Sequence, residues 1–118
     1  MKQTKELIMI VEDDRQIQDF IAYSLMTAGF GVLTAGGVEE AMRKMRSKKP
    51  DIMVLDLGLP DGDGLDLIRR VRKFSDIPII VVSARDKEED KIEALDRGAE
   101  DYITKPFSES ELMARIRV

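Results

Sequence analysis

Polar side chains that could do chemistry follow several short apolar runs of the sequence. Glu12 and Asp13 come directly after the first run, and Asp56 follows a later one. Ser83 and Lys105 stand at the ends of two further runs. Together they offer three carboxylates, one hydroxyl and one ammonium group, which would form a charged site if the fold brings these positions together.

Such a set of groups could support phosphoryl transfer to a carboxylate. Clustered carboxylates repel one another and raise each other's pKa unless a cation joins them. A hard divalent ion suits the cluster, and we expect Mg²⁺, which commonly uses one or two carboxylates together with phosphate oxygens. A carboxylate can be the nucleophile and form an acyl phosphate. The metal ion and the lysine would then neutralise charge on the transferring group.

Taken singly, each of these residues has a more ordinary interpretation. An acid after a strand is commonly a helix cap or a solvated turn residue, and Ser83 could also be a cap. Asp56 could be a turn acid, and Lys105 could simply face solvent. Their combination favours the chemical interpretation, because four strand ends independently supply compatible groups.

Composition excludes several other kinds of chemistry. The chain has 118 residues and contains neither cysteine nor histidine. Disulfides, thiolate metal sites, histidine-dependent triads and the HExxH zinc motif are therefore excluded. With 19 Lys+Arg against 23 Asp+Glu, the net charge is −4, which argues against direct binding of nucleic acid by this segment.

An alternation of strands and helices must position the candidate residues. Apolar runs predict strands, and a period near 3.6 predicts helices. Strands are expected at 7–11, 31–35, 52–55, 77–82 and 102–104, and helices over 17–28, 38–45, 65–74, 87–97 and from 112 onward. Asp14 is expected to cap the first helix, and Gly29 to end it. Ile92 and Leu95 are expected to anchor the charged fourth helix. The many turn-forming residues of 58–64 predict a loop there.

This order of elements predicts one α/β domain with a parallel sheet and helices on both faces. In such sheets, ligands bind beyond the carboxyl ends of the strands, which is where the candidate residues stand. Other site motifs fail. Asp61-x-Asp63 begins like an EF-hand loop, but later positions lack the required ligands, and no glycine-rich phosphate loop follows a strand. Acids at the first strand end would repel a flavin phosphate.

Four segments resemble those of the receiver domains of two-component response regulators. They are Val11–Asp14, Leu55–Gly64, Val82–Arg85 and Gly98–Phe107. The second and fourth look like the winged-helix transcription-factor branch, and 56–64 is especially similar to the Kdp-type, potassium-responsive regulators. The resemblance implies a flavodoxin-like receiver fold over 1–118, with strand order 2-1-3-4-5 and a C-terminal output domain outside this chain.

The resemblance also implies a role for each acid of the site. Asp56 would be the phosphoacceptor, supplied by the phosphohistidine of a sensor histidine kinase. Asp13 would bind Mg²⁺ directly, Glu12 would act through water, and the backbone carbonyl of Gly58 would complete the protein ligands. Asp14 is interpreted as a cap rather than a ligand.

Three further roles concern the response to phosphorylation. Ser83 would be the hydroxyl that moves to bond the phosphoryl group, and Lys105 would pair with a phosphoryl oxygen. Tyr102 would be the aromatic residue coupled to Ser83. The Lys105–Pro106 peptide is typically cis in this family, an arrangement that is accessible mainly before proline.

In the winged-helix branch, the face formed by the fourth helix, fifth strand and fifth helix makes a symmetric homodimer with salt bridges. The matching pairs here are Lys91 with Glu111, Asp101 with Arg115, and Asp96 with Arg117. An isologous dimer uses each pair twice. Each exposed bridge contributes under ~1 kcal/mol, so these pairs would mainly set the register.

The leading hypothesis is a signalling module, not an enzyme, that assists its own phosphorylation and dephosphorylation and controls transcription. DNA contact would belong to the missing output domain. A stand-alone receiver that docks on another protein is a second hypothesis. A Mg²⁺-dependent phosphatase is a third, but it needs a second acid where Gly58 stands.

The 7–11 run is too short for a membrane span or signal-peptide core, so we expect a cytoplasmic protein without membrane contact.

Overall fold

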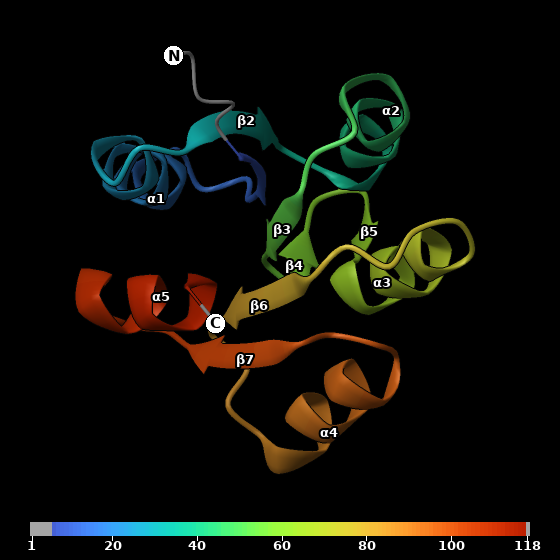
Figure 1. The fold of residues 1–118 in the computed structure, drawn as a ribbon. Helices are drawn as coiled ribbons and strands as arrows, with labels where there is room; N and C mark the ends of the chain where they lie inside the picture. The colour runs from blue at the N-terminus through green and yellow to red at the C-terminus, as the bar shows by residue number, and fades with distance from the viewer. Residues whose placement is uncertain (1–5, 118) are drawn as a thin grey trace.

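A five-stranded parallel sheet forms the centre of the protein, as seen in a computed structural model that describes residues 6–117 (Figure 1). The strand order is β2-β1-β3-β6-β7. The strands of this sheet are β1 (Leu7–Val11), β2 (Gly31–Ala35), β3 (Ile52–Leu55), β6 (Ile79–Ser83) and β7 (Asp101–Thr104). The polar segment 1–5, expected to hold no targeting signal, lies outside the described residues.

Among residues 6–117, five helices cover the two faces of the sheet. They are α1 (Arg15–Thr27), α2 (Val38–Lys48), α3 (Gly64–Arg72), α4 (Glu88–Asp96) and α5 (Glu109–Ile116). α1 and α5 lie on one face, and α2, α3 and α4 lie on the other (Figure 1). The β-α alternation predicted from the sequence is confirmed.

The first helix shows how the local sequence sets the helix ends. Asp14 Oδ1 accepts the N–H groups of Gln16 and Ile17 at 3.0 and 3.2 Å, which satisfies two donors that the first turn leaves unpaired. After the C-cap residue Ala28, Gly29 has φ +99°, a conformation in which a Cβ would be strained. Both expected ends of this helix are confirmed.

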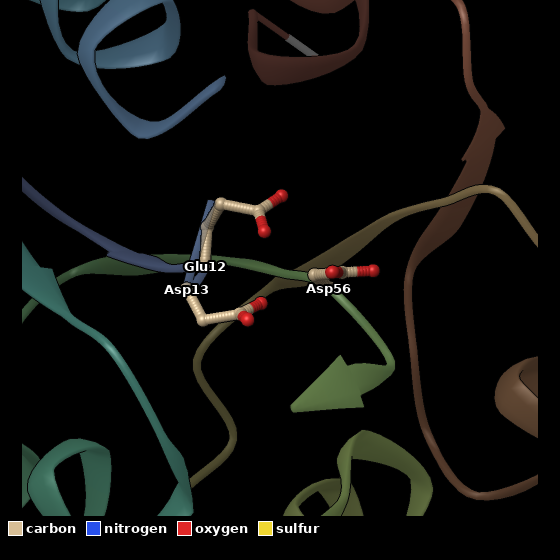
Figure 2. Close-up of side chains that lie close together, drawn as sticks. All are labelled: Glu12, Asp13 and Asp56. Carbon is tan, nitrogen blue, oxygen red and sulfur yellow. The ribbon is translucent and has the colours of Figure 1, made fainter. Parts of the chain in front are cut away.

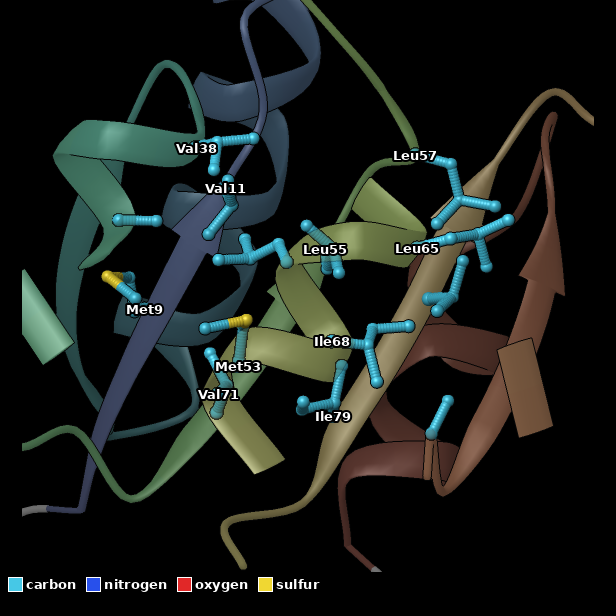
Figure 3. Close-up of a cluster of buried hydrophobic side chains, with 14 of the residues drawn as sticks. Met9, Val11, Val38, Met53, Leu55, Leu57, Leu65, Ile68, Val71 and Ile79 are labelled. Atoms are coloured by element: carbon cyan, nitrogen blue, oxygen red, sulfur yellow. The ribbon is translucent and has the colours of Figure 1, made fainter. Parts of the chain in front are cut away.

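Two apolar layers hold the helices on the sheet. Because neighbouring side chains of a strand point to opposite faces, Met9 and Val11 pack under α2 and α3, while Ile8 and Ile10 pack under α1 and α5. Figure 3 shows the first of these layers. The strands are buried on both sides, which explains why their sequences are continuous apolar runs.

The segment predicted as a loop contains a short antiparallel hairpin instead. Its strands are β4 (Gly58–Leu59) and β5 (Gly62–Asp63). They do not join the main sheet, but they add two strands to the count, so the order reads 2-1-3-6-7 and not the expected 2-1-3-4-5.

The packing of α4 also differs from the expectation. Ile92 and Leu95 are 51% and 45% exposed, whereas Ala94 is fully buried. The prediction that Ile92 and Leu95 anchor this helix was wrong, because α4 meets the sheet through the face that bears the small residue. A helix held by so little buried apolar surface can move at a modest cost in free energy.

Within residues 6–117, no helix is both long enough and apolar enough to cross a membrane.

Candidate functional site: an acidic cluster at the carboxyl edge of the sheet

The candidate site lies where β1 and β3 end side by side. Val11 and Leu55, the last residues of these strands, are partners in the parallel register. The residues that follow therefore leave the sheet at the same place, and the carboxylates of Glu12, Asp13 and Asp56 are directed to one side of it (Figure 2). One carboxylate oxygen from each lies within 4.8 Å of the others. The three acids predicted to cluster are thus brought together.

Lys105 reaches this cluster from the end of β7. Its Nζ donates to Glu12 Oε1 at 2.8 Å and lies 3.6 Å from Asp56 Oδ2. The N–H of Lys105 donates to the carbonyl of Ser83, which continues the β6–β7 pairing. Only 3% of the Glu12 side chain and 11% of the Asp56 side chain is exposed, so solvent screens their charges weakly. The peptide bond before Pro106 is cis, as the resemblance implied.

Burial and charge together shift the pKa of two of these groups. Burial raises the pKa of the Glu12 carboxyl and the charge of Asp56 adds to this, while the hydrogen bonds from Lys105 and the Asp14 N–H oppose it. Burial acts to lower the pKa of Lys105, but the hydrogen bond to Glu12 and the charge of Asp56 outweigh it, so this pKa is raised. Lys105 therefore remains charged at neutral pH and neutralises part of the acidic cluster.

Ser83 and Tyr102, on the neighbouring strands β6 and β7, are connected through Arg85. The buried Ser83 Oγ accepts the N–H of Arg85 at 3.2 Å. The Tyr102 hydroxyl donates to the Arg85 carbonyl at 2.7 Å, and burial raises the pKa of Tyr102. The Arg85 guanidinium forms an ion pair with Asp63 at 3.2 Å. Arg85 thus joins Ser83 and Tyr102 to the hairpin that follows Asp56.

The hairpin and the start of α3 hold the backbone around Asp56. Gly58 pairs with Asp63, and the Gly58 N–H lies 3.4 Å from Asp56 Oδ1. Asp63 Oδ1 also caps α3 by accepting the N–H of Leu65 at 2.9 Å. A Cβ placed on Gly64 would lie 2.7 Å from the Asp56 carbonyl oxygen. The close approach of α3 to Asp56 therefore requires glycine at position 64.

Asp61 has a positioning role that its sequence context did not reveal. Its carboxylate accepts the N–H groups of Val38 and Glu39 at 2.7 and 3.1 Å, and these bonds lower its pKa. The N-cap residue of α2 is Gly37, which has no side chain to supply this cap. A glycine at that position was the one sequence signal that the cap of α2 comes from another segment.

The donor set of the cluster fits a hard divalent cation. Three carboxylates offer oxygen atoms at close range, and such ions prefer oxygen ligands. Asp13 is exposed, and so is Gly58, whose backbone carbonyl stands two residues after Asp56. Solvent can therefore reach the cluster from this side, while Glu12 is buried beneath it and bonded to Lys105.

The six residues expected at a dimer interface lie along α4, β7, α5 and the residue that follows α5. Asp101 and Arg115 already form an ion pair within the chain, at 3.3 Å. Among residues 6–117, the other four have no ion-pair partner within 4.0 Å; these are Lys91, Asp96, Glu111 and Arg117. The exposed side chains of Ile92 and Leu95 also belong to α4.

The sequence model of a protein family, the response regulator receiver domain, matches residues 8–117. The chain belongs to this family. This receiver domain is 48% identical over 111 residues to the KDP operon transcriptional regulatory protein KdpE of Escherichia coli (strain K12). It is 51% identical over 111 residues to the transcriptional regulatory protein KdpE of Staphylococcus aureus. The receiver domain is thus of the KdpE type, as the 56–64 segment predicted.

These matches cover 94% of the receiver domain but only 49% and 48% of the two relatives, so the chain spans about half the length of the curated relatives it matches. Among solved structures, the BeF3-activated N-terminal receiver domain of Klebsiella pneumoniae RstA superimposes with a TM-score of 0.91 at 33% identity. That likeness covers 95% of this chain and 96% of the other.

Proposed function

We propose that the protein is the phosphoacceptor module of a KdpE-like regulator, in which Asp56 accepts a phosphoryl group from the phosphohistidine of a sensor kinase. The observation that carries this proposal is the position of the Lys105 ammonium between Glu12 and Asp56, 2.8 and 3.6 Å from their carboxylates. Lysine at this point can neutralise an oxygen of a group attached to Asp56. An ordinary turn acid would have no such partner.

The reaction requires this chain to supply one nucleophile and the groups that neutralise charge around it. A carboxylate oxygen of Asp56 attacks phosphorus and forms an O–P bond, while the P–N bond breaks and its electron pair stays on the imidazole of the kinase. Asp13, Asp56 and the Gly58 carbonyl would hold Mg²⁺, with Glu12 acting through water. When bound, this ion neutralises charge on the transferring group. The Lys105 ammonium stabilises another phosphoryl oxygen.

Phosphorylation would then be sensed by Ser83 and Tyr102. The new group carries a charge near −2 and three acceptor oxygens, so the Ser83 hydroxyl gains a partner by moving toward it. Tyr102 takes the space that Ser83 leaves, and its bond to the Arg85 carbonyl is exchanged for new packing against α4. Shifting the equilibrium between the conformations before and after these movements from 1:99 to 99:1 requires about 5.5 kcal/mol. The phosphoryl group would have to favour the second conformation by this amount.

The α4–β7–α5 face is the part of the protein proposed to respond. α4 is weakly anchored, and it carries the exposed Ile92 and Leu95 beside Lys91 and Asp96. In a symmetric dimer, these apolar side chains would be buried, and Lys91, Asp96 and Asp101 would pair with Glu111, Arg117 and Arg115 of the second copy. For Asp101 to do so, its ion pair with Arg115 of the same chain must break, or Asp101 must pair with both arginines.

The dimer would control a DNA-binding output domain that lies outside this chain. The two KdpE relatives are named transcriptional regulatory proteins, and each is about twice as long as this chain. We therefore assign DNA contact to the additional segment, and phosphorylation and dimerisation to the residues described.

Addition of beryllium fluoride together with Mg²⁺ is expected to raise the melting temperature and convert the monomer to a dimer. Beryllium fluoride imitates a phosphoryl group on a carboxylate, so it should bond to Asp56 and be held by Ser83 and Lys105. Thermal unfolding measures binding, and gel filtration of the same samples measures the oligomeric state.

The control for this experiment is Asp56→Asn, in which the amide cannot coordinate beryllium fluoride. An equal rise in melting temperature for both proteins would contradict the proposed site. A rise without a change in elution would leave the phosphoacceptor in place but contradict the dimer.

A hollow beside the site offers a docking surface for the kinase. It has a volume of about 410 Å³ and is lined by Gln16, Ile17, Phe20, Lys105, Pro106 and Phe107. The rings of Phe20 and Phe107 are 6.0 Å apart, and Phe20 is 43% exposed. An apolar side chain of the kinase seated here would lie next to the lysine that faces Asp56.

Substitution of Phe20 by serine is therefore expected to slow transfer from a sensor kinase about tenfold or more, since exposed aromatic anchors dominate interface energies. Transfer from a small acyl phosphate, which needs no docking, should be unchanged. Met26→Ser removes an exposed apolar side chain from the last turn of α1, outside the hollow, and is the matched control. Equal loss with both donors would show that Phe20 acts on the site itself and would contradict a docking role.

A further inference from the structure

A second apolar hollow lies at the opposite edge of the sheet from Asp56. It has a volume of about 370 Å³ and is lined by residues from the ends of α2 and α3 and from the segments that lead into β3 and β6. The lining includes Met45, Arg46, Lys49, Pro50, Phe74 and Ile77. We call this hollow the α2–α3 groove. Because it lies at the amino edge of the strands, a partner bound there would leave the phosphoacceptor site accessible.

The segments that line the groove carry a net positive charge. Residues 38–51 and 64–77 together contain nine Lys/Arg and five Asp/Glu, a net charge of +4 in a chain whose total is −4. Within these segments, Arg70, Lys44 and Arg69 are paired with carboxylates. Arg46 and Lys49, at the rim of the groove, have no carboxylate within 4.0 Å among residues 6–117.

Phe74 forms an exposed apolar wall of the groove. It is 49% exposed, and the Arg46 guanidinium lies 5.9 Å from the centre of its ring. Arginine stacked on an aromatic ring presents a fixed charge beside an apolar surface. The floor is formed by Met45 and Pro50, both buried. A ligand that matches this surface needs both an apolar group and a negative charge.

Lys49, at the rim of the groove, ends α2 in a left-handed backbone conformation. It is the C-cap of α2, with φ 50° and ψ 63°, and it is the one non-glycine residue with positive φ among residues 6–117. Glycine is preferred at this position because it has no Cβ to clash. The sequence thus places a cation at the rim of the groove, at a left-handed helix end where glycine would be the more stable choice.

We propose that the α2–α3 groove binds an acidic segment of a partner polypeptide, inserting an apolar side chain against Phe74 and pairing its carboxylates with Arg46 and Lys49. The hollow favours a polypeptide over a nucleic acid or a lipid surface, because it accepts one large side chain and has charges only at the rim. Aromatic or branched aliphatic residues flanked by Asp or Glu meet both requirements.

The proposal is tested by selecting binders from a random peptide display library on the intact protein. Enriched peptides should be acidic and contain an aromatic or branched apolar residue. Their affinity should fall about tenfold for Arg46→Glu and for Phe74→Ser. Arg43→Ala removes an exposed cation from the same helix outside the groove and is the matched control, for which affinity should change less than twofold.

Lys49→Gly gives a second, independent readout. This variant should melt at a higher temperature than the natural protein, because strain is relieved, yet it should bind the selected peptides severalfold more weakly. Beryllium fluoride with Mg²⁺ should leave peptide affinity unchanged, so failure of this proposal is distinguishable from failure of the phosphoacceptor assignment.

Several results would overturn the proposal. One is that no peptide family is enriched, and another is that enriched peptides bind Arg46→Glu as tightly as the natural protein. Competition of the peptides by a random DNA duplex, or by vesicles of phosphatidylserine, at equal charge concentration would assign the groove to nucleic acid or to membrane instead.

Discussion

Replacement of Lys105 by alanine is expected to slow phosphorylation of Asp56 by about a hundredfold, the effect of removing one preorganised charge from a transferring group. The Lys105 Nζ lies 3.6 Å from Asp56 Oδ2, so it is placed to stabilise charge as the O–P bond forms. The rate of phosphoryl uptake from a small acyl phosphate with saturating Mg²⁺ measures this loss without involving a kinase.

The same substitution is expected to destabilise the fold by about 3 kcal/mol when divalent ions are chelated. It leaves the Glu12 carboxylate, 3% exposed, without its 2.8 Å partner, and an unpaired buried charge is costly. Because Mg²⁺ neutralises the same carboxylates, adding it should recover part of the loss. Denaturant unfolding with and without chelator gives both values.

Lys73→Ala, which removes an exposed lysine at the end of α3, is the control and should alter neither rate nor stability. If Lys105→Ala retains the natural phosphorylation rate, the lysine does not contact the transferring group. If its stability is equal with and without Mg²⁺, the metal ion does not share the acids with Lys105.

A second large effect is expected from Gly64→Ala. A Cβ at this position would lie 2.7 Å from the Asp56 carbonyl oxygen and 2.8 Å from Leu57 Cα. Both contacts are with backbone, so either α3 or the Asp56 segment must shift. Overpacking of this kind costs about 1–3 kcal/mol. The displacement should also lower the phosphorylation rate at least about tenfold, because small misplacements of reacting groups are costly.

Gly58→Ala is the matched control for this prediction. A Cβ on Gly58 has no heavy atom within 4 Å, and Gly58 has no positive φ that would require glycine. Its stability should stay within about 0.5 kcal/mol of the natural protein. Equal destabilisation by the two substitutions would indicate a general intolerance of the loop rather than a contact specific to Gly64.

The main strands and the acidic cluster could be predicted because each depends on local sequence and on one topological rule. Apolar runs place Glu12 and Asp56 directly after strands, and parallel pairing brings strand ends to one edge. Neither step requires knowledge of side-chain packing. The same applies to Asp14 as a cap, since its two hydrogen bonds are made within one turn of its own helix.

Features that depend on contacts between distant segments could not be predicted in this way. Asp61 caps α2 across 23 residues of sequence, and Arg85 reaches Asp63 across 22. The exposure of Ile92 and Leu95 follows from which face of α4 meets the sheet, and a short charged helix gives little periodicity from which to infer that face. The pair between Asp101 and Arg115 within the chain likewise depends on how closely β7 and α5 approach.

The central claim is that Asp56 accepts a phosphoryl group, and covalent labelling tests it most directly. The protein is incubated with a small acyl phosphate and Mg²⁺, and the modified residue is located by mass spectrometry of its peptides. We expect a single phosphoryl group on Asp56, stable in acid and released by hydroxylamine, and no labelling of Asp56→Asn. Undiminished labelling of Asp56→Asn, or a phosphoryl group on a different residue of the natural protein, would contradict the assignment.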